Sequence, residues 1–206
     1  MPYGFLDALM GPSVQAAQAA HGVDQHWANF KGNRAFERFT PEEIAFIAER
    51  DSFYMATMSE TGWPYIQHRG GPKGFLKVLD NKTLGFPDFR GNLQYISVGN
   101  LGADDRACLF LMDYPRQARL KILAHVEVRD LSNDPGLASQ LATVGYKARI
   151  ERAMLLHLET FDWNCPQHIT PRWTAAEING AVKPLQEKIA SLEAELALLR
   201  QRLKGK

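Results

Sequence analysis

Hydrophobic and polar residues alternate through the middle of the chain, as they do in strands that bury one face. Residues 119–130 show this clearly, with apolar side chains at Ile122, Ala124 and Val126 separated by larger or more polar neighbours. Similar runs predict strands at residues 53–59, 63–69, 75–80, 83–88, 107–114, 119–130 and, last, within 149–163. Six or seven strands joined mostly by tight turns favour an antiparallel barrel or sandwich over an alternating βα sheet.

Helix signals occur before and between these strands. The residues from Thr40 to Glu43 read Thr-Pro-Glu-Glu, a capping box that predicts a helix running to about Arg50. An Ala- and Gln-rich stretch at 13–21, followed by Gly22, predicts a short helix with a glycine stop. Residues 135–146 predict another helix before the final strand. The fold class expected is therefore mainly β with flanking helices.

The C-terminal segment follows a different period. Apolar residues recur there at alternating spacings of four and three, in an unbroken heptad seam. One heptad position, a, is occupied by Val182, Ile189, Leu196 and Leu203, and the other, d, by Ile178, Leu185, Leu192 and Leu199. Because Asn179-Gly180 and Pro184 disturb helices, we expect the uninterrupted helix to begin near Pro184.

Two interpretations of this seam are open. The helix could pack on its own barrel, or it could associate with a second copy as a coiled coil. The seam is narrow and its flanks are charged, which favours self-association; the charged residues are Glu187, Lys188, Glu193, Glu195, Arg200 and Arg202. β-Branched residues at two of the a sites and mostly leucine at d favour two strands if the pairing is parallel.

Composition limits the remaining possibilities. The chain has 206 residues, 45% of them hydrophobic and 23% charged, which suits one globular domain with an appendage. We expect an N-terminal arm at 1–38, the barrel at 39–172 and the heptad helix at 173–206. The net charge of +1 gives no general attraction to nucleic acid or to an anionic membrane, and the apolar runs are too short to span a bilayer. Without a basic leader, and with only two cysteines, a cytoplasmic protein is expected.

Two glycine-bearing corners carry the candidate chemistry. The first follows a strand and reads His68-Arg69-Gly70-Gly71; glycines there permit positive φ and let the backbone approach a ligand. It does not match the nucleotide-binding P-loop or a dinucleotide fingerprint, and taken alone it is more often a charged surface turn. The second spans residues 86–96, with Arg90 just before a helix expected to start at about Leu93. Its helix N-terminus would favour an anion, which Arg90 could grip bidentately.

A third polar stretch, residues 161–173, follows the last strand. Cys165 and His168 have a C-x2-H spacing, but no second pair accompanies them, so we expect no metal site. A polar loop that holds amide and aromatic groups against a planar ligand is the interpretation preferred here.

At these residues the chain resembles the FMN-binding split-barrel family, the relatives of pyridoxamine 5′-phosphate oxidase. The segments that carry the resemblance are FYMATMSETGWPYIQHRGGPKGFLKVLD, TLGFPDFRGN, ACLFLMDYPRQARLKILAHVEV and FDWNCPQHI. The resemblance implies a six-stranded antiparallel split β-barrel that forms a homodimer with two flavin sites at the interface. It also implies FMN as cofactor.

The family's pattern can be carried over residue by residue. His68 and Arg69 match its first phosphate-binding position, and the loop after Asp88 matches the second, although the family often has Ser-Arg-Lys or Thr-x-x-Ser-x-Lys there. The resemblance implies that Phe86 and Asp88 lie along the flavin and that Arg119 lies near its ring or ribityl chain. The cofactor-binding residues expected in all are His68, Arg69, Gly70, Phe86, Asp88, Phe89, Arg90, Gly91, Asn92, Arg119, Asn164 and Gln167.

The function implied is an FMN-dependent oxidoreductase that passes hydride or electrons between FMN and a small molecule or NAD(P)H. No catalytic side chain is assigned, since the cofactor performs the chemistry. Pyridoxamine phosphate oxidation itself is not carried over, because the chain ends in the heptad helix where those oxidases have a Trp- and Arg-containing segment. The alternative is a module on the same fold that holds a flavin, a deazaflavin or haem without turnover.

Overall fold

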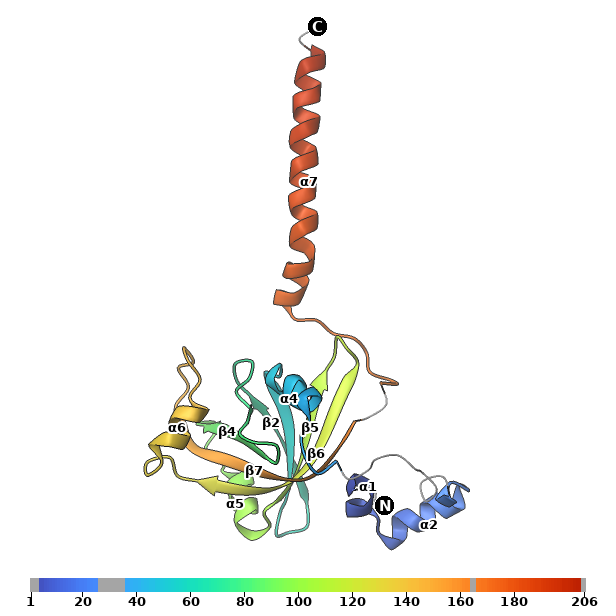
Figure 1. The fold of residues 1–206 in the computed structure, drawn as a ribbon, viewed down its shortest axis with the longest axis vertical. Coiled ribbons are helices and arrows are strands. Elements are labelled where there is room, and N and C mark those ends of the chain that lie inside the picture. Colours follow the sequence, from blue (N-terminus) through green and yellow to red (C-terminus); the bar gives the residue numbers. More distant parts are fainter. Residues whose placement is uncertain (1–3, 26–35, 164–165, 205–206) are drawn as a thin grey trace. The chain divides into compact units, whose positions relative to one another are not determined.

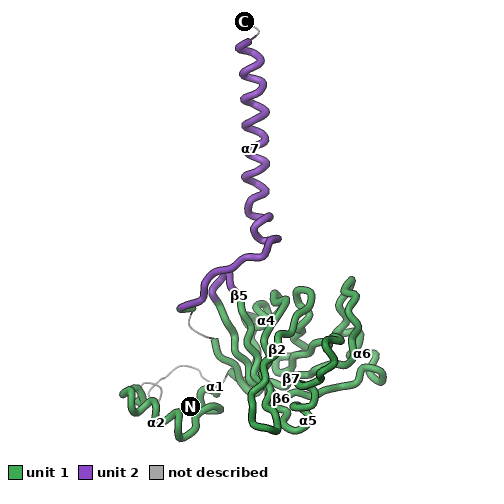
Figure 2. The backbone as a smooth tube through the Cα atoms, turned by 180° about the vertical axis from the view of Figure 1, so that it is seen from behind, with its two compact units in different colours: residues 1–113, 118–167 green, residues 114–117, 168–206 purple. Residues whose placement is uncertain are grey.

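The computed structural model describes residues 4–25, 36–163 and 166–204 (Figure 1). The chain divides into two compact units, one formed by residues 1–113 and 118–167 and the other by residues 114–117 and 168–206 (Figure 2). The first unit contains the β-sheet, and the second contains the long helix α7 (Ala175–Lys204).

The strands form one antiparallel sheet in the order β2-β1-β5-β6-β7-β4-β3. Their bounds are β1 Ser52–Met58, β2 Pro64–Gly70, β3 Lys77–Val78, β4 Thr83–Phe89, β5 Arg106–Asp113, β6 Ala118–Arg129 and β7 Ile150–Trp163. The predicted hairpins β1–β2, β3–β4 and β5–β6 are all present as adjacent antiparallel pairs, which confirms the mainly β antiparallel fold. The sheet has seven strands, the two-residue β3 extending one edge beside β4.

The sheet curls so that strands distant in its order come into contact. Phe53 on β1 packs edge-on against Phe86 on β4, with ring centroids 5.3 Å apart, although these strands are not sheet neighbours. Phe75 stacks on Phe53 at 5.7 Å, and all three rings are buried. Large apolar side chains of this kind stabilise a core by about 1.5–3 kcal/mol each. The aromatic cluster therefore fixes the curvature that brings β2 close to β4.

The helices of the first unit that lie wholly within the described residues are α1 Gly4–Leu9, α2 Pro12–Ala20, α4 Pro41–Ala48, α5 Ile96–Ala103 and α6 Pro135–Leu141. The predicted capping box of α4 is present: the Thr40 N–H donates to Glu43 Oε2 at 2.8 Å, and the Thr40 side chain accepts from Glu42 N. Glu43 also accepts a hydrogen bond from Trp163 Nε1 at 2.6 Å, which ties α4 to the end of β7. The Glu43 carboxylate thus caps α4 and also holds this helix against the last strand of the barrel.

Two helix boundaries differ from expectation in this unit. α6 ends at Leu141 and not near 146, because Thr143 accepts a turn hydrogen bond from the Tyr146 N–H and Gly145 adopts φ +78°. α1 has no counterpart among the predicted elements; its Phe5 is buried, and Lys121 lies 4.4 Å from the centre of the Phe5 ring. The short helix predicted at 13–21 is confirmed as α2, and Gly22 after it has φ +65°.

The second unit consists of the turn 114–117, the segment 168–174 and α7. Gln117 Nε2 donates to the Ile169 carbonyl at 2.6 Å. A second capping box starts α7, since the Thr174 N–H donates to Glu177 Oε2 and the Glu177 N–H donates back to Thr174 Oγ1. The expectation that the helix begins near Pro184 is wrong: α7 runs without interruption from Ala175. The capping box stabilises the helical turns that precede Pro184. Because proline lacks a backbone N–H, only one helical hydrogen bond is lost at Pro184.

Within the described residues no helix is both long enough and apolar enough to cross a membrane.

A buried ion pair links α4 to β5. Arg50 Nη2 lies 2.7 Å from Asp113 Oδ2, and the two side chains are 10% and 6% exposed. Arg50 also donates to the carbonyls of Met112 and Phe46. Removing Asp113 leaves the buried guanidinium with the more exposed Glu49 carboxylate, 3.3 Å from Nη2, in place of its buried partner. We therefore expect Asp113→Ala to lower the free energy of unfolding by about 3 kcal/mol, the lower end of the range for breaking a buried pair.

Denaturant-induced unfolding measures this change. Glu127→Ala is the matched control, because Glu127 pairs with Arg129 at a site where both side chains are at least 40% exposed. An exposed pair of this kind contributes less than about 1 kcal/mol. If both variants lost the same free energy of unfolding, the Arg50–Asp113 pair would contribute no more to stability than an exposed ion pair.

Candidate functional site

The two corners singled out in the sequence meet at one cleft. The cleft has a volume of about 40 Å³ and lies between the end of β2, the loop from β4 to α5 and the start of β7. It is lined by Tyr65, Gln67, Arg69, Asp88, Phe89, Gly91, Asn92, Leu93, Gln94, Tyr95, Ile96, Ser97, Val98 and Glu151. Because a water needs about 10–15 Å³, this space holds a small polar group and not a fused ring system.

Strand alternation places Arg69 in the cleft. On β2 the side chains of Tyr65, Gln67 and Arg69 share one face, while Ile66 and His68 share the other and are exposed. Gln67 is held in place by the Ser97 hydroxyl, which lies 3.2 Å from Gln67 Oε1. The inward face of β2 is therefore polar, and α5 contributes the group that orients it.

An ion pair joins the two corners directly. Arg69 Nη1 donates to Asp88 Oδ1 at 2.6 Å, and the two side chains are only 12% and 8% exposed. The guanidinium carbon lies 5.8 Å from the centre of the Phe86 ring beneath it. Among the described residues, Arg69 Nε is the one buried side-chain polar atom that has no hydrogen-bond partner. A buried donor left unpaired is costly and indicates a place where a further acceptor would fit.

Further charges surround this pair. Arg152 Nε lies 3.7 Å from Asp88 Oδ2, and Glu151 is close to both Arg152 (3.0 Å) and Arg90 (3.8 Å). The three guanidinium groups thus face the two carboxylates of Asp88 and Glu151. Arg90, an expected binding residue, is the most exposed of these cations, with 46% of its side chain accessible; it lies beside Glu151 and is not itself a lining residue of the cleft. The arrangement leaves an excess of positive charge beside the unpaired Arg69 Nε.

Burial raises the pKa of Asp88 above its usual value. The guanidinium groups of Arg69 and Arg152 act in the opposite direction, and the neighbouring Glu151 carboxylate raises the pKa further. Desolvation disfavours the ionised carboxylate, so Asp88 takes up a proton at a higher pH than an exposed aspartate does. The charge of the cleft therefore depends on pH through Asp88.

A β-bulge brings consecutive residues to the same cleft. The register between β4 and β7 pairs Asp88 with Arg152 but Phe89 with Ile150, so Glu151 is an extra residue on β7. A bulge of this kind re-aims side chains that would otherwise alternate between faces. It explains how Glu151 and Arg152, which are adjacent on β7, both lie beside Asp88, with Glu151 lining the cleft and Arg152 reaching the Asp88 carboxylate.

The loop after the bulge is strained and held by local hydrogen bonds. Asn92 Oδ1 accepts from the Gln94 N–H at 3.1 Å, which closes a short turn. Leu93 and Tyr95 adopt left-handed φ values of 66° and 52°, unusual for residues other than glycine. The Tyr95 hydroxyl donates to Glu151 Oε1 at 3.2 Å. Strained backbone of this kind clusters at functional sites and is kept only where its surroundings enforce it.

The expected helix start at about Leu93 is wrong. α5 begins at Ile96, and Tyr95 precedes it as an N-cap residue without a side-chain hydrogen bond to the helix. The side chain of Asn92 caps the turn at Gln94 instead, so it is not available to a helix start at Leu93. Gly91 and Asn92 still line the cleft, but they belong to a loop.

The glycines of the first corner have a different role from the one expected. Gly70 and Gly71 do not adopt positive φ. A Cβ atom at Gly71 would lie 2.7 Å from Cγ of the buried Phe75 ring, and one at Gly70 would lie 2.9 Å from Cε1 of His68. Their missing side chains therefore make room for packing within the chain, and neither glycine lines the cleft.

Several other expected binding residues lie outside the cleft. The His68 ring packs edge-on against Tyr54 on the outer face of β2, with centroids 5.6 Å apart. Phe86 is enclosed in the core at 1% exposure, so its ring supports Arg69 from beneath and does not face the cleft. Arg119 lies on β6 opposite Met112 and is not a lining residue. Gln167 is exposed after β7, and Asn164 lies outside the described residues.

Sequence reasoning missed other lining residues. Gln67 could have been found, because it precedes Arg69 by two positions on a predicted strand and must share its face. Glu151, and Arg152 beside the cleft, carried no such signal, since they reach Asp88 only through the pairing of β4 with β7. Tyr95 was not expected to line the cleft, because the sequence predicted that a helix would already have begun at about Leu93.

A second groove, of about 550 Å³, lies over β1, β5 and β6. Its walls include Ala56, Cys108, Leu123 and His125, and burial raises the pKa of the Cys108 thiol. No residue lines both this groove and the cleft.

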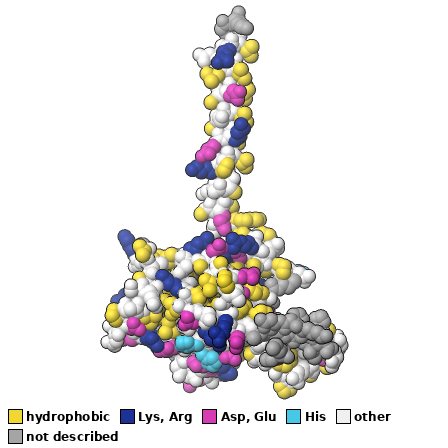
Figure 3. Space-filling model, viewed as in Figure 1, with side chains coloured by type: hydrophobic (Ala, Val, Ile, Leu, Met, Phe, Trp, Pro, Cys, Tyr) yellow, Lys and Arg dark blue, Asp and Glu magenta, His cyan; other side chains and the backbone are white. Residues whose placement is uncertain are grey.

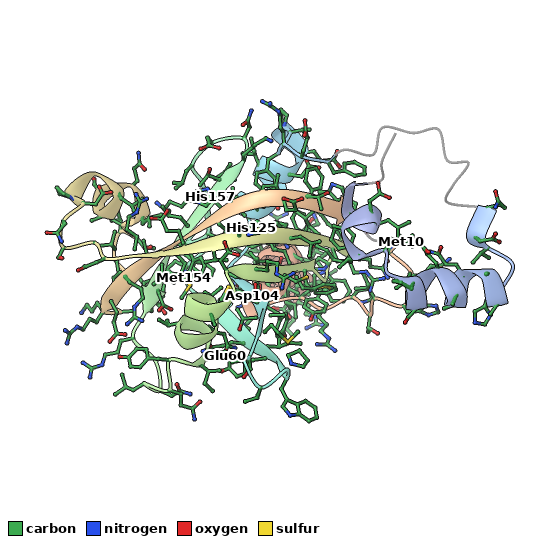
Figure 4. All side chains as sticks on the ribbon, turned by 90° about the horizontal axis from the view of Figure 1, so that it is seen from below. Met10, Glu60, Asp104, His125, Met154 and His157 are labelled. Atoms are coloured by element: carbon green, nitrogen blue, oxygen red, sulfur yellow. The ribbon has the colours of Figure 1, made fainter. Side chains whose placement is uncertain are left out.

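Exposed imidazoles lie on the strands beside this groove. His125 on β6 is the direct cross-strand partner of His157 on β7 (Figure 4). His125 Nδ1 lies 2.8 Å from Asp105 Oδ1, and His157 Nε2 lies 3.6 Å from Glu127 Oε2. Figure 3 shows imidazole side chains gathered among acidic and basic groups on this face. The described residues contain no cluster of three or more His, Cys, Asp or Glu placed to hold a metal ion.

Comparison with known proteins places the chain in a family. The family profile described as pyridoxamine 5′-phosphate oxidase matches residues 39–163, which is more than half of the chain. The chain belongs to the pyridoxamine 5′-phosphate oxidase family. The match covers β1 to β7 and therefore the whole cleft. It confirms the resemblance drawn from the sequence. No curated protein matches the chain.

Solved structures with a similar fold include three from bacteria. HupZ of Group A Streptococcus is 14% identical, with 66% of this chain and 100% of that chain covered and a TM-score of 0.49. A Clostridium acetobutylicum protein related to general stress protein 26 is 17% identical, with coverage of 66% and 94% and a TM-score of 0.44. An FMN-binding protein of Syntrophomonas wolfei is 13% identical, with coverage of 71% and 97% and a TM-score of 0.46.

The contrast between glycines at the two corners is testable. Gly71→Ala would force a Cβ atom against the buried Phe75 ring, so we expect a loss of about 1–3 kcal/mol in the free energy of unfolding. Gly91→Ala is the control, because nothing lies within 4 Å of its Cβ position. Chemical denaturation of both variants measures the difference. Equal stability of the two variants would contradict the packing role assigned to Gly71.

Proposed function

We propose that this member of the pyridoxamine 5′-phosphate oxidase family binds FMN and acts as an oxidoreductase. The observation that carries the proposal is the convergence of Arg69 with the Asp88–Asn92 segment on one small polar cleft. Its electron donor or acceptor would be NAD(P)H or another small organic molecule. FMN, when bound, supplies the ring through which hydride or electrons pass.

The residues of the cleft fit the phosphate of FMN. The buried Arg69 Nε–H has no acceptor, and a phosphate oxygen would provide one. Arg90 is half exposed at the second corner and can turn from Glu151 toward an anion. Gly91 has open space at its Cβ position, so its backbone is accessible. The volume of about 40 Å³ suits a group of phosphate size.

The rest of the cofactor needs a larger surface than the cleft. The outer face of β1 and β2 exposes Tyr54, Met58 and Ile66, at 42%, 43% and 64% of their surface. Contiguous exposed apolar side chains of this kind mark interaction sites. We infer that two copies pair through this face, in keeping with the homodimer that the family resemblance implies. Sedimentation of the flavin-loaded protein as a single chain would contradict this pairing.

The first test is the affinity for FMN. We expect protein purified without added cofactor to show flavin absorbance, and Arg69→Ala and Arg90→Ala each to weaken FMN binding roughly ten- to a hundredfold, the effect of losing a charged hydrogen bond. Fluorescence quenching of titrated FMN measures the dissociation constant. Arg129→Ala is the control, since this arginine is 40% exposed and is not a lining residue of the cleft. Unchanged affinity in both the Arg69 and the Arg90 variant would show that other residues hold the phosphate.

Turnover is tested separately from binding. Anaerobic addition of NADH or NADPH to the flavin-loaded protein should bleach the flavin absorbance if the protein is an oxidoreductase. A flavin that stays oxidised with every donor tried would leave cofactor binding intact and contradict the redox function.

The raised pKa of Asp88 gives a pH prediction. Above that pKa the carboxylate is ionised and repels a phosphate, and as the pH falls through it the repulsion is lost. FMN also gains a proton near neutral pH, so Asp88→Asn serves as the reference. We expect the ratio of the wild-type to the Asp88→Asn dissociation constant to exceed one at high pH and to approach one in acid. A ratio that does not change with pH would exclude Asp88 from the phosphate's surroundings.

A further inference from the structure

Helix α7 has an apolar seam that the other described residues of its own unit, 114–117 and 168–174, do not cover. No residue of Ala175–Lys204 is buried. The large apolar side chains of the seam are 44–75% exposed, namely Ile178, Leu185, Ile189, Leu192, Leu196, Leu199 and Leu203. A continuous exposed stripe of this length favours association with another helix.

The charged residues beside the seam occupy defined heptad positions. With Val182, Ile189, Leu196 and Leu203 at a, the e positions are Asn179, Gln186, Glu193 and Arg200, and the g positions are Ala181, Lys188, Glu195 and Arg202. In a parallel pair, each g residue faces the e residue five positions later on the other helix. The e and g residues therefore decide which orientation and register are favourable.

A parallel, in-register pair brings opposite charges together at every position where both residues are charged. Lys188 faces Glu193 of the second copy, and Glu195 faces Arg200 of the second copy. Two-fold symmetry repeats both contacts, which gives four ion pairs. In an antiparallel pair with full overlap of the seams, g faces g, and only Lys188 and Glu195 meet as opposite charges. Charge complementarity thus favours the parallel arrangement.

The remaining positions agree with it. Val182 and Ile189 are β-branched residues at a, and Leu185, Leu192 and Leu199 occupy d, the combination that favours two strands in parallel coiled coils. Pro184 falls at position c, on the side away from the seam, so its ring does not interrupt the apolar contact. Lys183 and Glu187 approach to 4.0 Å on the outside of the same helix.

We propose that α7 pairs with α7 of a second copy as a parallel, in-register two-stranded coiled coil. The parallel arrangement starts both helices at the same end of the coil, so both sheet units are attached to that end. Such a tether keeps two copies at an effective concentration in the millimolar range. This inference concerns a surface outside the flavin cleft and stands independently of the proposed cofactor.

Disulfide cross-linking of the full-length protein tests the pairing. In a parallel coil, Leu199→Cys at d faces itself, whereas Gln201→Cys at f lies on the outside. We expect oxidation to cross-link Leu199→Cys into a covalent dimer at least about tenfold faster than Gln201→Cys. The coil holds the two thiols at position d next to each other, whereas the two thiols at position f lie on its opposite outer sides. The unsubstituted protein, with its two natural cysteines, sets the background. Equal rates for the two variants would overturn the proposal, whether the helix stays single or covers another surface.

Orientation is tested by mixing two variants. In the antiparallel arrangement Leu185→Cys faces Leu196→Cys of the other chain, so that mixture would give more cross-linked dimer than either variant alone. In the parallel arrangement each variant cross-links with itself. A dominant mixed product would overturn the parallel register.

Charge substitutions give a second, independent readout. Lys188→Glu on the Leu199→Cys background places like charges opposite Glu193, and we expect cross-linking to slow severalfold at low salt. Adding Glu193→Lys restores the attraction only if the helices are parallel, since Glu193 faces Gln186 in the antiparallel pair. Recovery of the rate supports the proposal, and failure to recover overturns it. High salt should reduce the difference between the variants.

Discussion

The ion pair between Arg69 and Asp88 is the interaction on which both the barrel and the cleft depend. It joins β2 to β4, two strands that are not neighbours in the sheet, and so helps to hold the curled sheet closed at one end. Both groups are nearly buried, and a buried charge is tolerated only when a partner compensates it. The hydrogen-bonding capacity of Arg69 is not fully used, however, because its Nε–H still lacks an acceptor. The closure of the barrel and the proposed phosphate site therefore involve the same guanidinium group.

Much of the fold could be predicted because its determinants are local. The turns that separate β1 from β2 and β3 from β4 are encoded within a few residues, and the capping box of α4 is visible as a four-residue pattern. Arg69 faces the cleft because strand residues alternate between faces. The partners of Asp88 could not be predicted in this way. Glu151 and Arg152 reach it from about 60 positions further along the chain, through a strand pairing with no local signal.

The corner residues also show where composition misleads. A glycine pair beside charged residues is typical of a loop that approaches a ligand, yet Gly71 makes room for the Phe75 ring. In the loop after β4, the strain falls on Leu93 and Tyr95, which are not residues that usually accept left-handed backbone. An asparagine that resembles a helix cap closes a turn instead. In each case the deciding contact is with a group that the local sequence does not identify.

The extra residue on β7 has a consequence for protein engineering. With Glu151 inserted between the partners of Asp88 and Phe89, Glu151 and Arg152 both lie beside Asp88 although they are neighbours on β7. Transplanting the same side chains onto a regular barrel would send one of these two neighbours to the opposite surface. A working graft must carry the insertion together with the side chains, so the smallest portable unit is a pair of strands with their irregularity.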